Sequence, residues 1–283
     1  MRGNLKWTSS FNISFNKNKV TALSDGQESR MAGIRYPAIS DLYICKVGRP
    51  LSEMYGYIYD GVYQYSDFDE VSPGVYRLKD GIPNNTNDRA NIRPGDPKLR
   101  DINGDGKVTA EDRTVIGHGL PLHTGGFINN FEWKGFDLSI FLQWSYGNDV
   151  INYNRVLLES LQGRHLNQLA TAANHWRPDN PTDYLWAPNR GLNNLHTSRE
   201  VEDASFLRLK NIQLGYTLPA KWLRGTRLAS VRLYLSAQNV ATLTRYTGYD
   251  PEVSTRNSAM TRGFDYSAYP KAQSFTFGVK IDL

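Results

Sequence analysis

The chain contains little of what most other classes of protein need. Its 283 residues include one cysteine, Cys45, so no disulfide can form within the chain. No apolar run approaches the roughly 18 residues that a membrane-spanning helix needs. The start of the chain, residues 1–7, has no apolar segment typical of a signal peptide and enters a strand pattern at once. We therefore expect a chain cut from a longer protein.

Motifs of catalysis and of nucleic-acid binding are also absent. The sequence has no Gly-x-Ser-x-Gly, Walker or Gly-x-Gly-x-x-Gly motif, and its five histidines are dispersed. The formal net charge is +5, but the lysines and arginines are scattered. A nucleic-acid interface would concentrate them on one element. The sequence therefore predicts neither an enzyme nor a nucleic-acid partner.

Alternation of apolar and polar residues with a period of two is the most abundant pattern. Between Phe136 and Tyr146 every even position is large and apolar, whereas four of the five odd positions are polar. This alternation is typical of a sheet with one apolar and one polar face. Similar patterns predict about eight strands in all: Leu5–Phe15, Ile39–Lys46, Leu51–Asp60, Phe127–Trp133, Phe136–Tyr146, Phe206–Leu218, Val231–Ala241 and Ala272–Leu283.

The connections between these strands alternate in length. From the C-terminus they are long, short, long, short, long and short: Thr242–Lys271, Pro219–Leu228, Gly147–Ser205, Lys134–Gly135, Gly61–Pro121 and Val47–Pro50. Outer-membrane barrels keep short turns on one rim and long extracellular loops on the other, and a soluble sandwich has no reason to do so. The pattern predicts an all-β, antiparallel transmembrane barrel. Its lipid-facing residues would be Phe136, Leu138, Ile140, Leu142 and Trp144, with Asp137, Ser139 and Gln143 facing the lumen.

One segment of a long connection, residues 95–117, has the spacing of a calcium-binding loop. Oxygen donors occur at alternate positions, and Gly106 permits the sharp bend at position 6. The last position carries Asp112 where an EF-hand has Glu, and no helix precedes the loop. The spacing predicts a structural Ca²⁺ site with these ligands: Asp101, Asn103, Asp105, the carbonyl of Lys107, Thr109 and Asp112. A turn rich in Asx residues that holds itself together without metal is the alternative.

In their order along the chain, these segments resemble the C-terminal part of the SusC/RagA-type TonB-linked outer-membrane proteins, which are TonB-dependent transporters. The resemblance spans nearly the whole chain and departs at Leu283, where the family usually ends in an aromatic residue. The segments that carry it include Trp7–Val20, Val47–Leu51, Tyr55–Val62, the Asp101 loop, Lys134–Ser139, Phe206–Pro219 and Tyr246–Val253.

The resemblance implies that residues 1–283 are part of a barrel of about 22 strands, the N-terminal strands and plug being absent from this sequence. It further implies uptake of oligosaccharides or peptides across the outer membrane of a Gram-negative bacterium. Its partners would be a SusD-like lipoprotein and, through the absent N-terminal part, the TonB–ExbB–ExbD complex.

Two other interpretations fit the same strands. The chain could form a self-contained eight-stranded outer-membrane barrel that acts as an adhesin or structural protein. It could also be a soluble, Ca²⁺-stabilised β-protein that binds glycans through aromatic residues such as Trp144, Tyr146 and Trp186.

Overall fold

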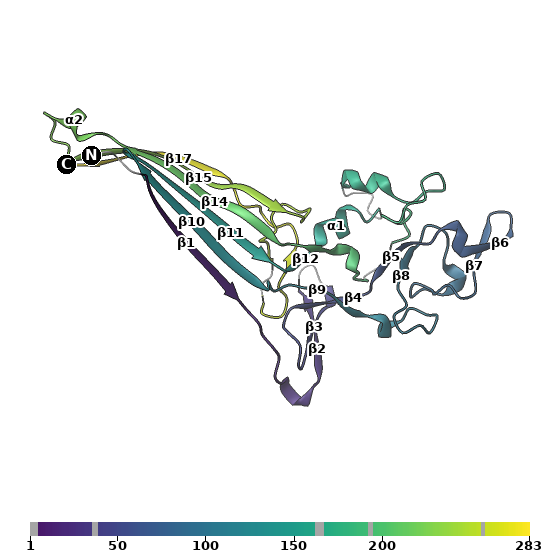
Figure 1. The fold of residues 1–283 in the computed structure, drawn as a ribbon. Coiled ribbons are helices and arrows are strands. Elements are labelled where there is room, and N and C mark those ends of the chain that lie inside the picture. The colour runs from purple at the N-terminus through teal and green to yellow at the C-terminus, as the bar shows by residue number, and fades with distance from the viewer. Residues whose placement is uncertain (1–4, 36–38, 162–166, 192–194, 256–257) are drawn as a thin grey trace.

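The computed structural model describes residues 5–35, 39–161, 167–191, 195–255 and 258–283. Figure 1 shows a long curved sheet, here called the wall, with a body of short strands and loops at one of its ends. This body, here called the cap, is built from three connections of the wall, residues 16–122, 147–205 and 245–273.

The wall is a six-stranded sheet in which every neighbouring pair is antiparallel. Its strands are 9 to 15 residues long. That length suits a tilted strand that crosses a bilayer, which needs about 9–11 residues. In spatial order the strands are β1 (Lys6–Phe15), β10 (His123–Trp133), β11 (Phe136–Tyr146), β14 (Phe206–Thr217), β15 (Ser230–Thr244) and β17 (Ser274–Asp282).

The connections alternate between the two ends of the wall, as the sequence predicts. The two-residue turn 134–135 and the link 218–229, which contains α2 (Ala220–Leu223), lie on one rim. The three cap connections leave from the opposite rim (Figure 1). We refer to these ends as the short-turn rim and the long-loop rim.

The prediction of about eight barrel strands is wrong in its count, because two of them belong to the cap. β3 (Ile39–Lys46) and β4 (Glu53–Gly56) pair with β2 (Ser29–Ile34) and β9 (Thr114–His118) in a separate sheet. Adjacent residues Leu42 and Tyr43 are both buried, so both faces of β3 are covered. The turn 47–50 therefore lies with the long loops. Among the described residues, β1 and β17 each pair on one side only, and the wall is not closed.

The cap contains several apolar cores, some of which are shared between connections. One buried cluster combines Tyr43 and Met54 with Ile151 and Phe264, so all three cap connections contribute to it. None of the described helices is long and apolar enough to cross a membrane.

The other cap elements are short strands, one short helix and 3-10 turns. The strands and the helix are β5 (Tyr59–Val62), β6 (Phe68–Ser72), β7 (Val75–Leu78), β8 (Pro97–Leu99), β12 (Asp149–Asn152), α1 (Tyr153–Leu158), β13 (Val201–Asp203) and β16 (Phe264–Asp265). The 3-10 turns are Ser24–Gly26, Tyr65–Asp67, Arg89–Asn91, Ala110–Asp112, Ala170–Asn174 and Ser198–Glu200.

Candidate functional site

One face of the wall is largely apolar on all six strands. Directly opposed residues of antiparallel strands lie on the same face. Leu138 is opposed by Phe131 and Leu214, so the three form one row. The five predicted lipid-facing residues of β11 all lie on this face. Its outer strands leave large side chains exposed, namely Trp7, Phe11, Phe15, Phe275, Phe277, Val279 and Ile281. An exposed apolar surface of this extent is typical of a face in contact with lipid or a partner.

Aromatic residues gather at both ends of the apolar face. At the short-turn rim the rings of Phe136 and Tyr216 lie 4.5 Å apart, centre to centre. At the long-loop rim Tyr146 stacks on His123, and Phe15 packs on the other side of the same ring. Aromatic belts of this kind mark the two interfaces of a membrane.

The opposite face of the wall is polar and carries ion pairs. Asp137 lies on this face, as predicted for the lumen, and the Nε of Arg232 donates to its Oδ1 over 2.9 Å. The pair reaches across β14 directly above Gly215, where a Cβ atom would lie 2.4 Å from the Arg232 Nη2. Glycine at position 215 therefore leaves room for a charged contact between strands that are not neighbours.

A buried arginine fixes the third cap connection to the polar face. Arg208 of β14 is 2% exposed, and its guanidinium contacts Asp250 at 2.5 Å and Glu252 at 3.2 Å. Lys271 pairs with Glu252 as well. Although burial raises the pKa of Asp250, the hydrogen bond from Arg208 holds it below its usual value. The carboxylate of Asp250 therefore stays charged, and the two ion pairs of Arg208 tie Asp250 and Glu252 to the wall.

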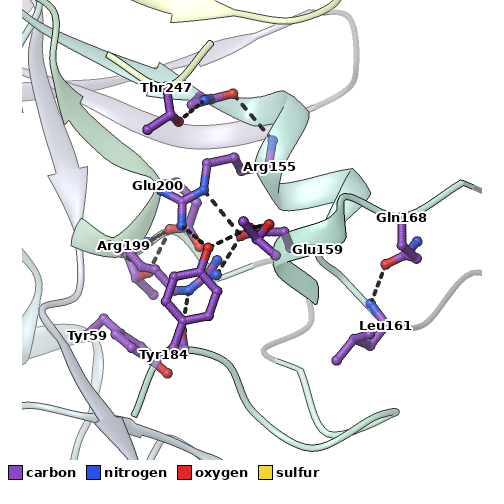
Figure 2. A network of polar contacts seen from close by, with 12 residues as sticks. Tyr59, Arg155, Glu159, Leu161, Gln168, Tyr184, Arg199, Glu200 and Thr247 are labelled. Carbon is purple, nitrogen blue, oxygen red and sulfur yellow. Dashed lines mark hydrogen bonds and ion pairs between the residues drawn. The ribbon is translucent and has the colours of Figure 1, made fainter. Parts of the chain in front are cut away.

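A second network holds the cap together around the carboxylate of Glu159 (Figure 2). This side chain is 1% exposed and accepts hydrogen bonds from Arg199 at 2.6 Å, from the Tyr184 hydroxyl at 2.8 Å and from Arg155 at 3.2 Å. Burial raises the pKa of Glu159, but the hydrogen bonds from Thr171 and Tyr184 and the charge of Arg199 bring it below its usual value. The network therefore holds a charged carboxylate in the interior of the cap.

The same network reaches the other two cap connections. Arg155 also donates to Glu202 over 2.9 Å, and Glu202 accepts from the backbone N–H of Thr247 over 2.7 Å. From the first connection, the Tyr59 hydroxyl donates to the carbonyl of Asp183 over 3.1 Å. Residues from all three connections are thus joined by polar contacts as well as by a shared apolar core.

The predicted calcium loop closes on itself through backbone amides. Asp101 accepts from the N–H groups of Gly104 and Gly106, while Asp105 accepts from that of Lys107. Asp112 is fully buried and accepts from the N–H groups of residues 102, 103 and 109. Burial raises the pKa of Asp112, but these backbone hydrogen bonds bring it below its usual value.

The donor oxygens of this loop are of the type that Ca²⁺ takes. Within the described residues, however, no group of three or more His, Cys, Asp or Glu side chains is arranged to hold a metal ion. The loop has the hydrogen bonds of an Asx-rich turn, and calcium binding stays a prediction.

The aromatic residues considered for glycan binding are dispersed. Trp144 lies on the apolar face and stacks on Phe11 at 5.5 Å, and Tyr146 is on the same face. Trp186 is buried in the cap, where it packs against Tyr59. These three residues therefore do not form one sugar-binding platform. The single cysteine, Cys45, is buried.

Sequence reasoning missed Arg208 and Glu159 as organising residues. For Arg208 a signal existed, because it is a charged residue between Leu207 and Leu209 in a strand. For Glu159 the local signal is Arg155, four residues before it, whereas Tyr184 and Arg199 lie 25 and 40 residues away along the chain.

Comparison with known proteins gives the family. No protein-family model matches the chain. It is 36% identical to TonB-dependent receptor P3 of Formosa agariphila over 281 residues, which is 97% of this chain and 26% of that receptor. TonB-dependent receptor P39 of the same organism is 31% identical over 98% of this chain and 28% of its own length. TonB-dependent receptor SusC of Bacteroides thetaiotaomicron is 25% identical over 98% of this chain and 24% of its own length.

Solved structures of related fold point to the same family. The RagAB peptide transporter superposes with a TM-score of 0.72 at 24% identity, over 98% of this chain and 27% of that one, which shows the shared fold. The RagAB peptide importer in its open-open state gives 0.71 at 25% identity, over 99% of this chain and 27% of that one. The chain spans about a quarter of the length of the curated relatives it matches. Taken with the two-faced wall and its alternating rims, these matches identify the chain as part of an outer-membrane protein of the SusC/RagA-type TonB-dependent receptors.

Proposed function

We propose that this chain supplies part of the barrel wall, and the loops above it, of a receptor that imports oligosaccharides or peptides through the outer membrane. The observation that carries the proposal is the two-faced wall with all three long connections at one rim. The apolar face suits lipid, and the polar face suits a lumen through which a hydrophilic substrate passes.

The partners follow from the same proposal. A relative that shares the fold is described as the RagAB peptide transporter, and another is named as the TonB-dependent receptor SusC. We infer that the cap lies beneath a SusD-like lipoprotein. Energy would come from the TonB–ExbB–ExbD complex, acting on a part of the receptor outside this sequence. The relatives named above are TonB-dependent receptors, so we propose transport and not catalysis.

Uptake by cells that carry the complete receptor tests this function. We expect labelled oligosaccharides or peptides to enter such cells, and we expect entry to fall to the background level when TonB is deleted. Uptake of both substrate classes should be measured, because the relatives support import without distinguishing between them. Entry that is unchanged without TonB, or no entry of either class, would contradict the proposal.

We also propose that residues 95–117 form a calcium module within the external cap, with Asp101, Asn103, Asp105, Lys107, Thr109 and Asp112 as ligands. The support is the alternate spacing of oxygen donors around Gly106. The module would be structural, since the loop lies in the long connection between β1 and β10 and not in the wall.

Asp105→Asn separates calcium binding from turn formation. The amide oxygen of Asn can still accept the hydrogen bond from the Lys107 N–H, so the turn is expected to persist. Affinity for Ca²⁺ should fall about tenfold or more, because one ligand charge is lost. Isothermal titration calorimetry with millimolar Ca²⁺ provides the measurement. If the unsubstituted protein gives no binding heat, the loop is a turn without metal.

A further inference from the structure

A cleft lies where the polar face of the wall meets the third cap connection. Its volume is about 180 Å³. Thr124, Gln143 and Ser145 of β10 and β11 line the wall side, and Glu252, Ser254 and Arg262 line the loop side. The cleft therefore opens beside the proposed path of the substrate, at the long-loop rim.

Three side chains in this cleft have hydrogen-bonding groups to spare. Within the described residues, the guanidinium of Arg262, the amide of Gln143 and the hydroxyl of Thr124 make no hydrogen bond or ion pair. Arg262 is exposed and is held in place by its backbone N–H, which donates to the Ser52 hydroxyl over 3.3 Å. Its five guanidinium N–H donors are left for a ligand.

The charges around the cleft favour an anion. The carboxylate of Glu252 is engaged by Arg208 and by Lys271, and that of Asp250 by Arg208. Arg262 lines the same cleft, and within the described residues no carboxylate pairs with its guanidinium. Arginine is the side chain best suited to bind a carboxylate, because its planar fork makes two parallel hydrogen bonds.

The size of the cleft limits what it can hold. Pockets for drug-sized ligands are about 300–1,000 Å³, and this cleft is smaller. A cleft of this size fits one terminal sugar or amino-acid residue of a longer substrate. The remaining residues of that substrate would lie along the polar face.

We propose that this cleft is a carboxylate-binding subsite of the receptor, in which Arg262 pairs with the carboxylate and Gln143 and Thr124 bind neighbouring polar groups. The inference rests on the proposed import function and limits the substrates to chains that carry a carboxylate at the unit bound in the cleft. The carboxylate can belong to a uronic-acid sugar or to the C-terminus of a peptide.

Binding of matched acidic and neutral probes to the complete receptor tests the subsite. Digalacturonate is compared with the neutral galactose disaccharide, and triglycine with triglycine amide, by isothermal titration calorimetry. We expect at least one acidic probe to bind about tenfold more tightly than its neutral counterpart. Arg262→Gln should abolish this difference, and Arg262→Lys should retain part of it. The pair that shows the difference identifies the source of the carboxylate.

Arg224→Gln is the matched control, because it removes the same charge from an exposed position at the short-turn rim. It should leave the preference for acidic probes unchanged. Equal affinity for acidic and neutral probes, no binding of any acidic probe, or an unchanged preference in Arg262→Gln would each overturn the subsite. TonB-dependent uptake of neutral substrates would in that case still support the import function, so the two proposals fail separately.

Discussion

Arginine at position 140 is expected to destabilise the barrel by about 2–4 kcal/mol, which is the cost of a cation on the lipid face near the bilayer midplane. Ile140 lies at the middle of β11, opposed by Asn129 on one side and Ile212 on the other. It is on the apolar face and remote from both aromatic ends. A guanidinium there could reach water only by distorting the bilayer or the wall.

The neighbouring residue provides the control, because a strand turns successive side chains to opposite faces. Ser139 is opposed by Asn130 and Gln213 on the polar face, where an added arginine can stay hydrated. Ser139→Arg should therefore cost far less than Ile140→Arg. The free energy of unfolding of the complete receptor barrel in lipid, obtained from denaturant titration, checks both. Similar costs at the two positions would mean that the faces are assigned wrongly.

The wall was predictable because its signals are local. The period-two alternation of β11 gives its two faces, and the adjacent turn is encoded by two residues. Lys134 and Gly135 have φ values of 48° and 89°, as a tight hairpin turn of the primed type requires. The alternation of short and long links also gives the direction of the wall strands, although it misplaces the link 47–50, which lies in the cap.

A bulge in β14 could also have been found from the sequence. Apolar residues occupy positions 207 and 209 and then 212, 214 and 216, so the phase changes between Leu209 and Ile212. The register shifts between Leu209 and Asn211, which leaves Lys210 without an opposed residue. The extra residue keeps the apolar side chains on one face before and after the shift.

The cap was not predictable in the same way. Apolar residues are about as frequent in β3 and β4 as in the wall strands. The faces of β3 and β4, however, are buried by segments that lie far away in the sequence. Met54, for example, packs in one cluster with Ile151 and Phe264. Local periodicity cannot distinguish a strand covered by lipid from one covered by loops, and this accounts for the two strands counted in excess.

The cap depends on contacts of that long-range kind, and Glu159→Ala is expected to disrupt it. The substitution leaves Arg199, whose side chain is 6% exposed, without its carboxylate, and Arg155 with Glu202 alone. Removal of one partner from a buried ion pair costs about 3–5 kcal/mol, because an uncompensated charge remains. Since the wall does not use this network, the loss should be confined to the cap. We expect faster amide hydrogen exchange in residues 147–205, while the wall strands keep their protection.

Glu132→Ala removes an exposed carboxylate instead of a buried one and serves as the control. Its ion pair with Lys6 has a length of 3.2 Å, but the two side chains are 58% and 67% exposed. Exposed pairs contribute about 0–1 kcal/mol, so exchange in the cap should not change. Glu159→Gln keeps the size of the side chain and an oxygen acceptor for Tyr184, and it should fall between the two. If Glu159→Ala left exchange in residues 147–205 at the wild-type rate, the apolar clusters alone would hold the three cap connections together, and the charge network would have another role.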